Sequence, residues 1–340
     1  MNKYWDEIKR NRTLIVVEGE HEKDNLIKMI IRIFPELSLN FDNVLVYGAD
    51  IYDLYQDIIK EYEEDWDENG CEIDIPYLIS KRLNIEPKLD KRNFTNIIMM
   101  FDYERHDSMF DFDKISRLQK HFINVSDEGI LYINYPMIES YLDMKRIPDI
   151  DYLNKKISVN VKPGEVYKKC VYKASVLWKC FKAYEIIKER IDSRFKDLSE
   201  DIRFAMVNSI LSIPIKELSL ESIAVQLEKF SSDTEKNNYF KHFISIKINE
   251  IDIEQTSMSF FEALRHYVVY IARQNILKAY LIQNGDCLKQ EACRKFMYAD
   301  LDFYNILEKQ NELSKDEMNG FILVLNTCVT FLGEYKFFWQ

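Results

Sequence analysis

An apolar run that ends in a carboxylate and a glycine constrains the fold of this chain more than any other feature. Residues 14–22 read Leu-Ile-Val-Val-Glu-Gly-Glu-His-Glu. The run Thr13–Val17 is apolar and rich in β-branched residues, which is typical of a strand buried in a sheet. Glycine permits a sharp turn, and an apolar stripe typical of a helix follows, at Leu26, Ile27, Ile30, Ile31 and Phe34. The segment therefore predicts a strand, a turn and a helix in an α/β fold.

The first half of the chain repeats this alternation. Pro136 is placed to open a further helix, as proline does in a first turn. Additional strands are predicted at 43–47, 96–101 and 130–133, and additional helices at 51–62, near 77–83 and near 115–122. This order predicts an α/β fold with a mostly parallel sheet flanked by helices on both faces.

The second half follows a different pattern. It contains one weak strand signal, near Phe243–Ile248, and otherwise reads as helices at 164–191, 199–212, 219–230, 258–283, 286–311 and 314–338. A chain of 340 residues is long enough for two domains. We therefore expect an α/β domain over residues 1–155, with an insertion around 63–92, and an all-α domain over residues 156–340.

Composition limits the classes of function. The chain is 47% apolar and carries 57 acidic against 46 basic residues, a net charge of −11. It has no overall field that attracts nucleic acid, so such a partner requires a local basic patch or a bridging metal. The six cysteines form no Cys-x-x-Cys pair, so neither a zinc site nor a disulfide framework is expected. The N-terminus, with Asp6 and Glu7, has no signal-peptide core, and Phe321–Leu332 predicts a buried helix too short to span a bilayer. We expect a cytoplasmic protein without membrane contact.

Carboxylates follow three of the predicted strands. Glu18 follows the first, Asp102 and Glu104 follow the third, and Glu139 follows the fourth. The carboxyl ends of parallel strands share one edge, so these side chains should converge, and hard cations such as Mg²⁺ or Mn²⁺ prefer oxygen ligands. Alternation along an extended chain would place Asp102 and Glu104 on one side. A single acid after a strand is usually a first-turn residue that suits the helix dipole, but three clusters together favour a metal site.

The roles of the acidic residues follow from this convergence. Glu18, Asp102, Glu104 and Glu139 are the predicted catalytic residues. The predicted metal ligands are Glu18, Asp102 and Glu104, with Glu22, one helical turn after Glu18, as an outer ligand.

Basic residues near these clusters are candidates for substrate contact. Arg105 and His106 directly follow Glu104. Along Tyr167–Tyr184, lysines gather on one half of a helical wheel, at positions that include Lys168, Lys169 and Lys173. These residues could guide a phosphate backbone to the site, or the lysines could form a solvated helix face.

Val17-Glu18-Gly19 before a helix, with Asp102-x-Glu104 after a later strand, resembles the Toprim domain over residues 13 to about 145. Glu18-Gly19-x-x-Glu22 is similar to the OLD-like nucleases. Pro136-Met-Ile-Glu139-Ser-Tyr-Leu142 is similar to an element of Toprim-like anti-phage effectors, including the toxin subunit of PARIS defence systems. The chain departs from the family at Glu104, where Asp is usual, and has no Gly-x-x-x-x-Gly-Lys loop, so it is not a full-length OLD protein.

The resemblance implies a Mg²⁺-dependent endonuclease that cleaves RNA, tRNA included, or DNA as a toxic effector of anti-phage defence. It also implies an ATPase partner, and the helical domain could serve a homodimer. Two alternatives stay open: a Toprim-fold module that binds or recruits nucleic acid without catalysis, and a topoisomerase or primase.

Overall fold

The computed structural model describes residues 12–68, 70–160, 164–251, 257–285 and 294–340, which form two compact units. The sheet unit comprises the described residues up to Tyr141 together with those of Ile150–Lys169 and Ile271–Gln340. The helical unit comprises Leu142–Asp149 and the described residues of Cys170–Tyr270. The predicted boundary at residue 155 does not match this grouping, because the last part of the chain returns to the sheet unit. Asp6, Glu7, Cys287 and Cys293 lie outside the described residues.

A five-stranded sheet forms the centre of the first unit, with the order β2-β1-β3-β5-β4. Its strands are β1 (Thr13–Val17), β2 (Val44–Val46), β3 (Asn96–Asp102), β4 (Ile123–Asn124) and β5 (Gly129–Asn134). The first, second, third and fifth strands run parallel, and β4 pairs antiparallel with β5 at the edge. The predicted mostly parallel sheet is confirmed. The sequence did not indicate β4, because its two residues are exposed and leave no apolar pattern.

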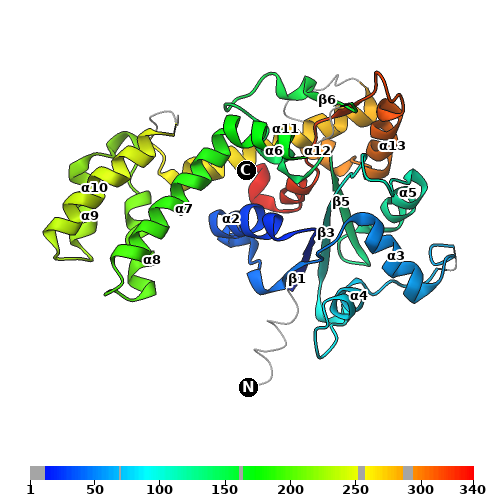
Figure 1. Cartoon of the computed structure of the whole chain (residues 1–340), viewed down its shortest axis with the longest axis horizontal. Helices are drawn as coiled ribbons and strands as arrows, with labels where there is room; N and C mark the ends of the chain where they lie inside the picture. The colour runs from blue at the N-terminus through cyan, green and yellow to red at the C-terminus, as the bar shows by residue number, and fades with distance from the viewer. Residues whose placement is uncertain (1–11, 69, 161–163, 252–256, 286–293) are drawn as a thin grey trace. The chain divides into compact units, whose positions relative to one another are not determined.

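Alternation along β1 directs side chains to opposite faces of the sheet. Leu14 and Val16 pack into a core with α3 (Ile51–Tyr62), α4 (Ile75–Arg82) and α5 (Phe112–His121). The other face carries α2 (Lys28–Ile33), which continues from a π-helical turn, η1 (Glu22–Ile27) (Figure 1). The helix boundaries have local causes: the carboxylates of Asp50 and Asp111 cap the first turns of α3 and α5.

The segment 63–92, expected to be an insertion, belongs to the core of the sheet unit. Trp66 and Ile73 are fully buried among the residues that also surround α3 and α5. The segment contains α4, which was predicted. Short 3₁₀ turns in the sheet unit are η2 (Pro35–Leu37), η3 (Phe41–Asn43), η4 (Lys91–Asn93), η5 (Ile138–Leu142) and η6 (Tyr152–Asn154).

The helix predicted at 314–338 and the buried helix predicted at Phe321–Leu332 were both wrong. The helix predicted at 314–338 is a strand, β7 (Phe321–Leu323), followed by η9 (Cys328–Glu334) and η10 (Lys336–Trp339). This strand pairs antiparallel with β6 (Lys156–Ser158), which was also not predicted. Periodicity cannot separate a short buried strand from a buried helix, and here tertiary partners decide: the side chain of Gln310 binds both the N–H and the C=O of Leu323.

The helix predicted at 286–311 is also divided. It contains α12 (Arg294–Ala299) and α13 (Phe303–Ser314), and residues 286–293 lie outside the described part. Asp302 interrupts the pattern because its carboxylate caps α13, accepting from the N–H groups of Tyr304 and Asn305.

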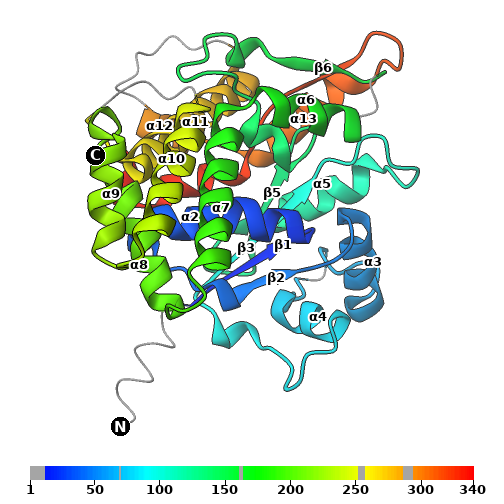
Figure 2. The same cartoon turned by 60° about the vertical axis from the view of Figure 1, so that its left-hand side comes forward.

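The second unit is helical, as predicted for this part of the chain. It contains α7 (Val176–Arg194), α8 (Glu200–Leu211), η7 (Ile215–Glu217), α9 (Leu220–Glu228), α10 (Thr234–Asn249) and the start of α11 (Phe260–Asn284) (Figure 2). The weak strand expected at Phe243–Ile248 was wrong. Phe240, Ile244 and Ile248 are buried at four-residue spacing, which fixes this segment as part of a helix.

The predicted helix 164–191 is two helices, α6 (Glu165–Ala174) and α7. The break is at Ser175, whose hydroxyl accepts from the N–H of Trp178 and caps α7. The lysine face expected along Tyr167–Tyr184 is therefore not the face of one helix. None of the helices in the described part of the chain combines the length and apolar character needed to cross a bilayer.

Candidate metal centre

The sheet has a topological switch point between β1 and β3. In the sheet, β2 lies on one side of β1, and β3 and β5 lie on the other side. The direction of strand addition therefore reverses after β2. In open α/β sheets ligands bind in the crevice outside the carboxyl ends of the strands at such a point. Glu18 directly follows the last residue of β1, and Asp102 is the last residue of β3. Strand topology therefore brings these two carboxylates to one place, as the sequence predicted.

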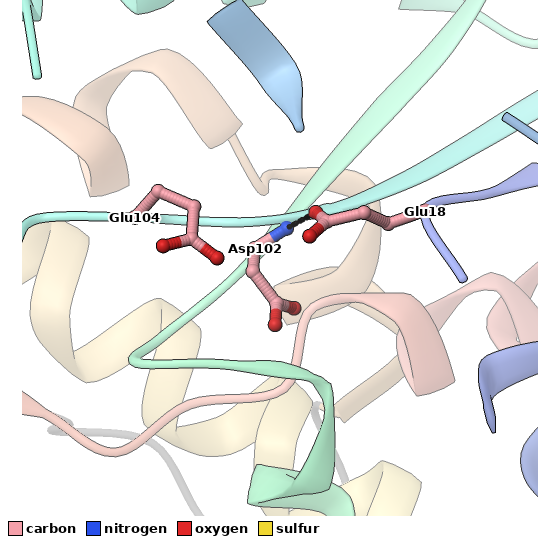
Figure 3. A group of neighbouring side chains, drawn as sticks. All are labelled: Glu18, Asp102 and Glu104. Carbon is pink, nitrogen blue, oxygen red and sulfur yellow. Dashed lines mark hydrogen bonds between the residues drawn. The ribbon is translucent and has the colours of Figure 1, made fainter. Parts of the chain in front are cut away.

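Three carboxylates meet there. Glu18, Asp102 and Glu104 each offer an oxygen, and these oxygens all lie within 4.8 Å of one another (Figure 3). The N–H of Asp102 donates to Glu18 Oε2 at 3.1 Å, which fixes the Glu18 side chain across the two strands. A cluster of carboxylate oxygens is the donor set that hard divalent cations prefer, so these residues fit Mg²⁺ or Mn²⁺.

Glu104 reaches the group by a turn and not by the extended alternation that the sequence suggested. Its φ is 44°, in the left-handed region that non-glycine residues seldom adopt. Tyr103, before it, is fully buried and packs against Phe110 and Tyr135. The aromatic anchor and the unusual backbone together direct Glu104 toward Asp102, and backbone strain of this kind is concentrated at functional sites.

Burial and mutual repulsion hold protons on these carboxylates. Burial raises the pKa of Glu18 to about 8. The hydrogen bond from Asp102 N–H opposes this shift, and the negative charges of Glu104, Glu22 and Asp50 add to it. Burial, with the charges of Glu18, Glu22 and Glu139, raises the pKa of Asp102 well above its usual range. A cation bound here would displace these protons, because carboxylates coordinate metal in the ionised form.

Asp50 was not predicted as part of this site. It caps α3, and its charge contributes to the raised pKa of both Glu18 and Glu104. The signal was available, because Asp50 follows β2, a neighbour of β1.

Glu22 is held beside the three carboxylates by the backbone. Its Oε2 accepts from the N–H of Gly19 at 2.8 Å, and the side chain is 7% exposed. A Cβ at Gly19 would lie 2.9 Å from that oxygen, so the approach requires glycine. Glu22, predicted as an outer ligand, thus lies at the start of η1 and outside the group of Glu18, Asp102 and Glu104.

Glu139 was expected to complete the site, and it lies outside the group of three carboxylates. It is fully buried, with Lys168 Nζ at 3.0 Å and His21 Nε2 at 3.5 Å from its Oε1. Burial lowers the pKa of Lys168, but the charges of Glu139, Asp102 and Glu22 outweigh this and raise it. Glu139 therefore lies in the same acidic neighbourhood, where it holds a lysine ammonium.

Arg105 and His106 lie on the same cavity. This cavity of about 310 Å³ is lined by both residues together with Glu104, Asp107, Ser108, Pro136 and Met137. Arg105 Nη2 also donates to the C=O of Ser314 at 3.2 Å, and the guanidinium lies over the ring of Phe110. Lys169 and Lys173 are exposed. Of the predicted substrate contacts, Arg105, His106 and Lys168 are thus placed beside the carboxylates.

Pro136 does not open an α-helix. The segment after β5 is the 3₁₀ turn η5, because its backbone groups bind tertiary partners: the N–H of Ile138 donates to Asp102 Oδ1 at 2.7 Å, and its C=O accepts from Asn326. No sequence pattern pointed to Asn326, which lies 188 residues away from Ile138 along the chain.

Comparison of the chain with protein-family models, with curated proteins and with solved structures found no match. The fold and the site define its class instead. It is an α/β protein with a mostly parallel sheet and a carboxylate cluster at the switch point, and a helical unit is inserted into the chain before its last part returns to the sheet unit.

Proposed function

We propose that this protein is a metal-dependent nuclease that hydrolyses phosphodiester bonds. The observation that carries the proposal is the group of Glu18, Asp102 and Glu104, whose oxygens approach one another within 4.8 Å at the carboxyl edge of the sheet. Carboxylates gathered at a switch point bind Mg²⁺ or Mn²⁺, and a nucleic-acid substrate of an acidic protein needs such a bridge.

The residues divide the chemistry between them. Asp102 and Glu104 would hold the cation, and when bound it would polarise a phosphate oxygen and lower the pKa of a coordinated water. Glu18, held by the N–H of Asp102, would accept a proton from the attacking water once a bound cation has displaced its own proton. The Lys168 ammonium, held by Glu139, is available to contact a non-bridging phosphate oxygen beside Asp102.

Within this class we infer a Toprim-domain nuclease of the OLD-like, anti-phage effector type. The parallel strand order, Glu18 after β1, and Asp102 and Glu104 after β3 support this inference. The resemblance further suggests RNA, tRNA included, or DNA as the substrate, a cytoplasmic location, an ATPase that restrains or delivers the effector, and a homodimer.

The test is a cleavage assay with the purified chain, Mg²⁺ or Mn²⁺, and three substrates: total RNA, plasmid and single-stranded DNA. We expect cleavage that stops with EDTA and in Asp102→Asn. Glu20→Gln serves as the matched control, because Glu20 is an exposed acid two residues from Glu18. Cleavage that persists in EDTA or in Asp102→Asn would contradict the proposal. Binding without cleavage would favour a recruitment module, and plasmid relaxation a topoisomerase.

A further inference from the structure

Three fully buried asparagines lie behind the metal centre in one hydrogen-bond network. Asn134 ends β5, Asn275 lies in α11 and Asn326 precedes η9, and each has no exposed surface. Buried amides are costly unless their hydrogen bonds are made, so such a network has one well-defined arrangement.

Asn326 is connected to Asp102 through the backbone of one residue, Ile138. Its Nδ2 donates to the C=O of Ile138 at 2.8 Å and to Ser140 Oγ at 3.2 Å. The N–H of the same Ile138 donates to Asp102 Oδ1 at 2.7 Å. Displacement of the Ile138 backbone therefore turns the Asp102 carboxylate, and Asn326 is the side chain that fixes this backbone.

Asn326 is itself fixed by its neighbours. Its N–H donates to Asn275 Oδ1 at 2.7 Å, and its Oδ1 accepts from the N–H of Val329 at 3.0 Å. Tyr152 OH donates to the same oxygen of Asn275, which connects η6 to α11. The amide thus has a set orientation, with the Nδ2 donors directed at the segment after β5.

The next residues hold the strand ends in the same way. Thr327 Oγ1 donates to the C=O of Ile133 at 2.8 Å, and the N–H of Cys328 donates to Asn134 Oδ1 at 3.3 Å. Asn134 in turn donates to the C=O of Phe101, the residue before Asp102. The C-terminal segment therefore contacts both β5 and the turn that carries the Asp102 partner.

We propose that Asn326 is a positioning residue of the metal centre, which orients Asp102 through the backbone of Ile138. The inference rests on the proposed metal-dependent function, and it names a residue distant in sequence that sets the affinity of the site. Groups that orient metal ligands in this way typically change metal affinity by about 10- to 100-fold when removed.

The experiment measures Mn²⁺ binding to the full chain by calorimetry, without nucleic acid, in wild type, Asn326→Ala and Gln310→Ala. Gln310 is the matched control: it is a fully buried amide that binds the backbone of Leu323 in the same C-terminal part. We expect Asn326→Ala to weaken Mn²⁺ binding by about 10- to 100-fold. Gln310→Ala should lower the thermal unfolding midpoint without changing Mn²⁺ affinity.

A second variant keeps the test decisive if Asn326→Ala does not fold. Thr327→Val is nearly isosteric and removes one hydrogen bond to β5, so Mn²⁺ binding should weaken by about twofold to tenfold. Unchanged Mn²⁺ affinity in folded Asn326→Ala, or in Thr327→Val where Asn326→Ala does not fold, overturns the inference. Wild type that binds Mn²⁺ but cleaves nothing refutes only the nuclease proposal, whereas wild type that binds no Mn²⁺ refutes both.

Discussion

Replacing Glu18 by glutamine should stabilise the metal-free protein, which is an unusual outcome for a site residue. Burial raises the pKa of Glu18 to about 8 from an ordinary value of 4.5. In the folded protein the side chain is therefore protonated at neutral pH, whereas in the unfolded chain it is ionised. The contribution of this proton to the free energy of unfolding is fully present below pH 4.5 and is lost as pH rises to about 8.

The size of the effect follows from the interval between these values. About 2.5 pH units separate 4.5 from pH 7, and each corresponds to about 1.4 kcal/mol, so the upper limit is about 3 kcal/mol at pH 7. A glutamine at this position has no proton to take up, and its amide oxygen can still accept from the N–H of Asp102. For a domain of this size, about 3 kcal/mol raises the thermal midpoint by roughly 6 °C.

The assay compares thermal unfolding of wild type, Glu18→Gln and the Glu20→Gln control in EDTA from pH 4.5 to 8.5. The difference between Glu18→Gln and wild type should be near zero at the lowest pH and grow up to about pH 8. Mn²⁺ should stabilise wild type increasingly over the same range, because binding requires the ionised carboxylate, and should have little effect on the variant. A difference that does not grow with pH, or that Glu20→Gln reproduces, would refute the reasoning.

Three further predictions concern residues around the centre. Lys168→Met should lower the free energy of unfolding by about 2 kcal/mol, because it leaves the buried Glu139 carboxylate without its lysine ammonium. In urea unfolding, adding Glu139→Gln to this variant should restore much of the lost stability, and additive losses would contradict the pairing. Gly19→Ala should displace Glu22, since the new Cβ would lie 2.9 Å from its carboxylate; calorimetry should show Mn²⁺ affinity reduced by roughly tenfold with the fold retained. Lys173→Glu should reduce the slope of log affinity against log salt for nucleic acid by roughly 0.7 to 0.9 if this exposed lysine contacts a phosphate; an unchanged slope would identify a solvated lysine.

Much of the sheet unit could be predicted because its signals are local. The apolar run before Glu18 can bury its side chains only as an interior strand, and the prediction matches β1 residue for residue. The helix Ile51–Tyr62 was likewise predicted with its observed bounds, because its apolar stripe and its cap lie in adjacent sequence. In the C-terminal part the same reasoning failed, because a short apolar run such as Phe321–Leu323 fits a strand and a buried helix equally well. The strand with which it pairs, β6, lies far earlier in the chain.

The amino-acid sequence by itself determined that Glu18 and Asp102 meet, because parallel strands that end in carboxylates share one edge. Only the tertiary structure decided what surrounds them. Glu139 follows β5 as expected, but its carboxylate forms an ion pair with Lys168 of α6. Asn326, near the end of the chain, donates to the C=O of Ile138, and the N–H of Ile138 donates to Asp102. A buried carboxylate or amide is costly unless it is paired, and its partner can come from any part of the chain that folds next to it. Local sequence patterns therefore do not predict which residue that partner is.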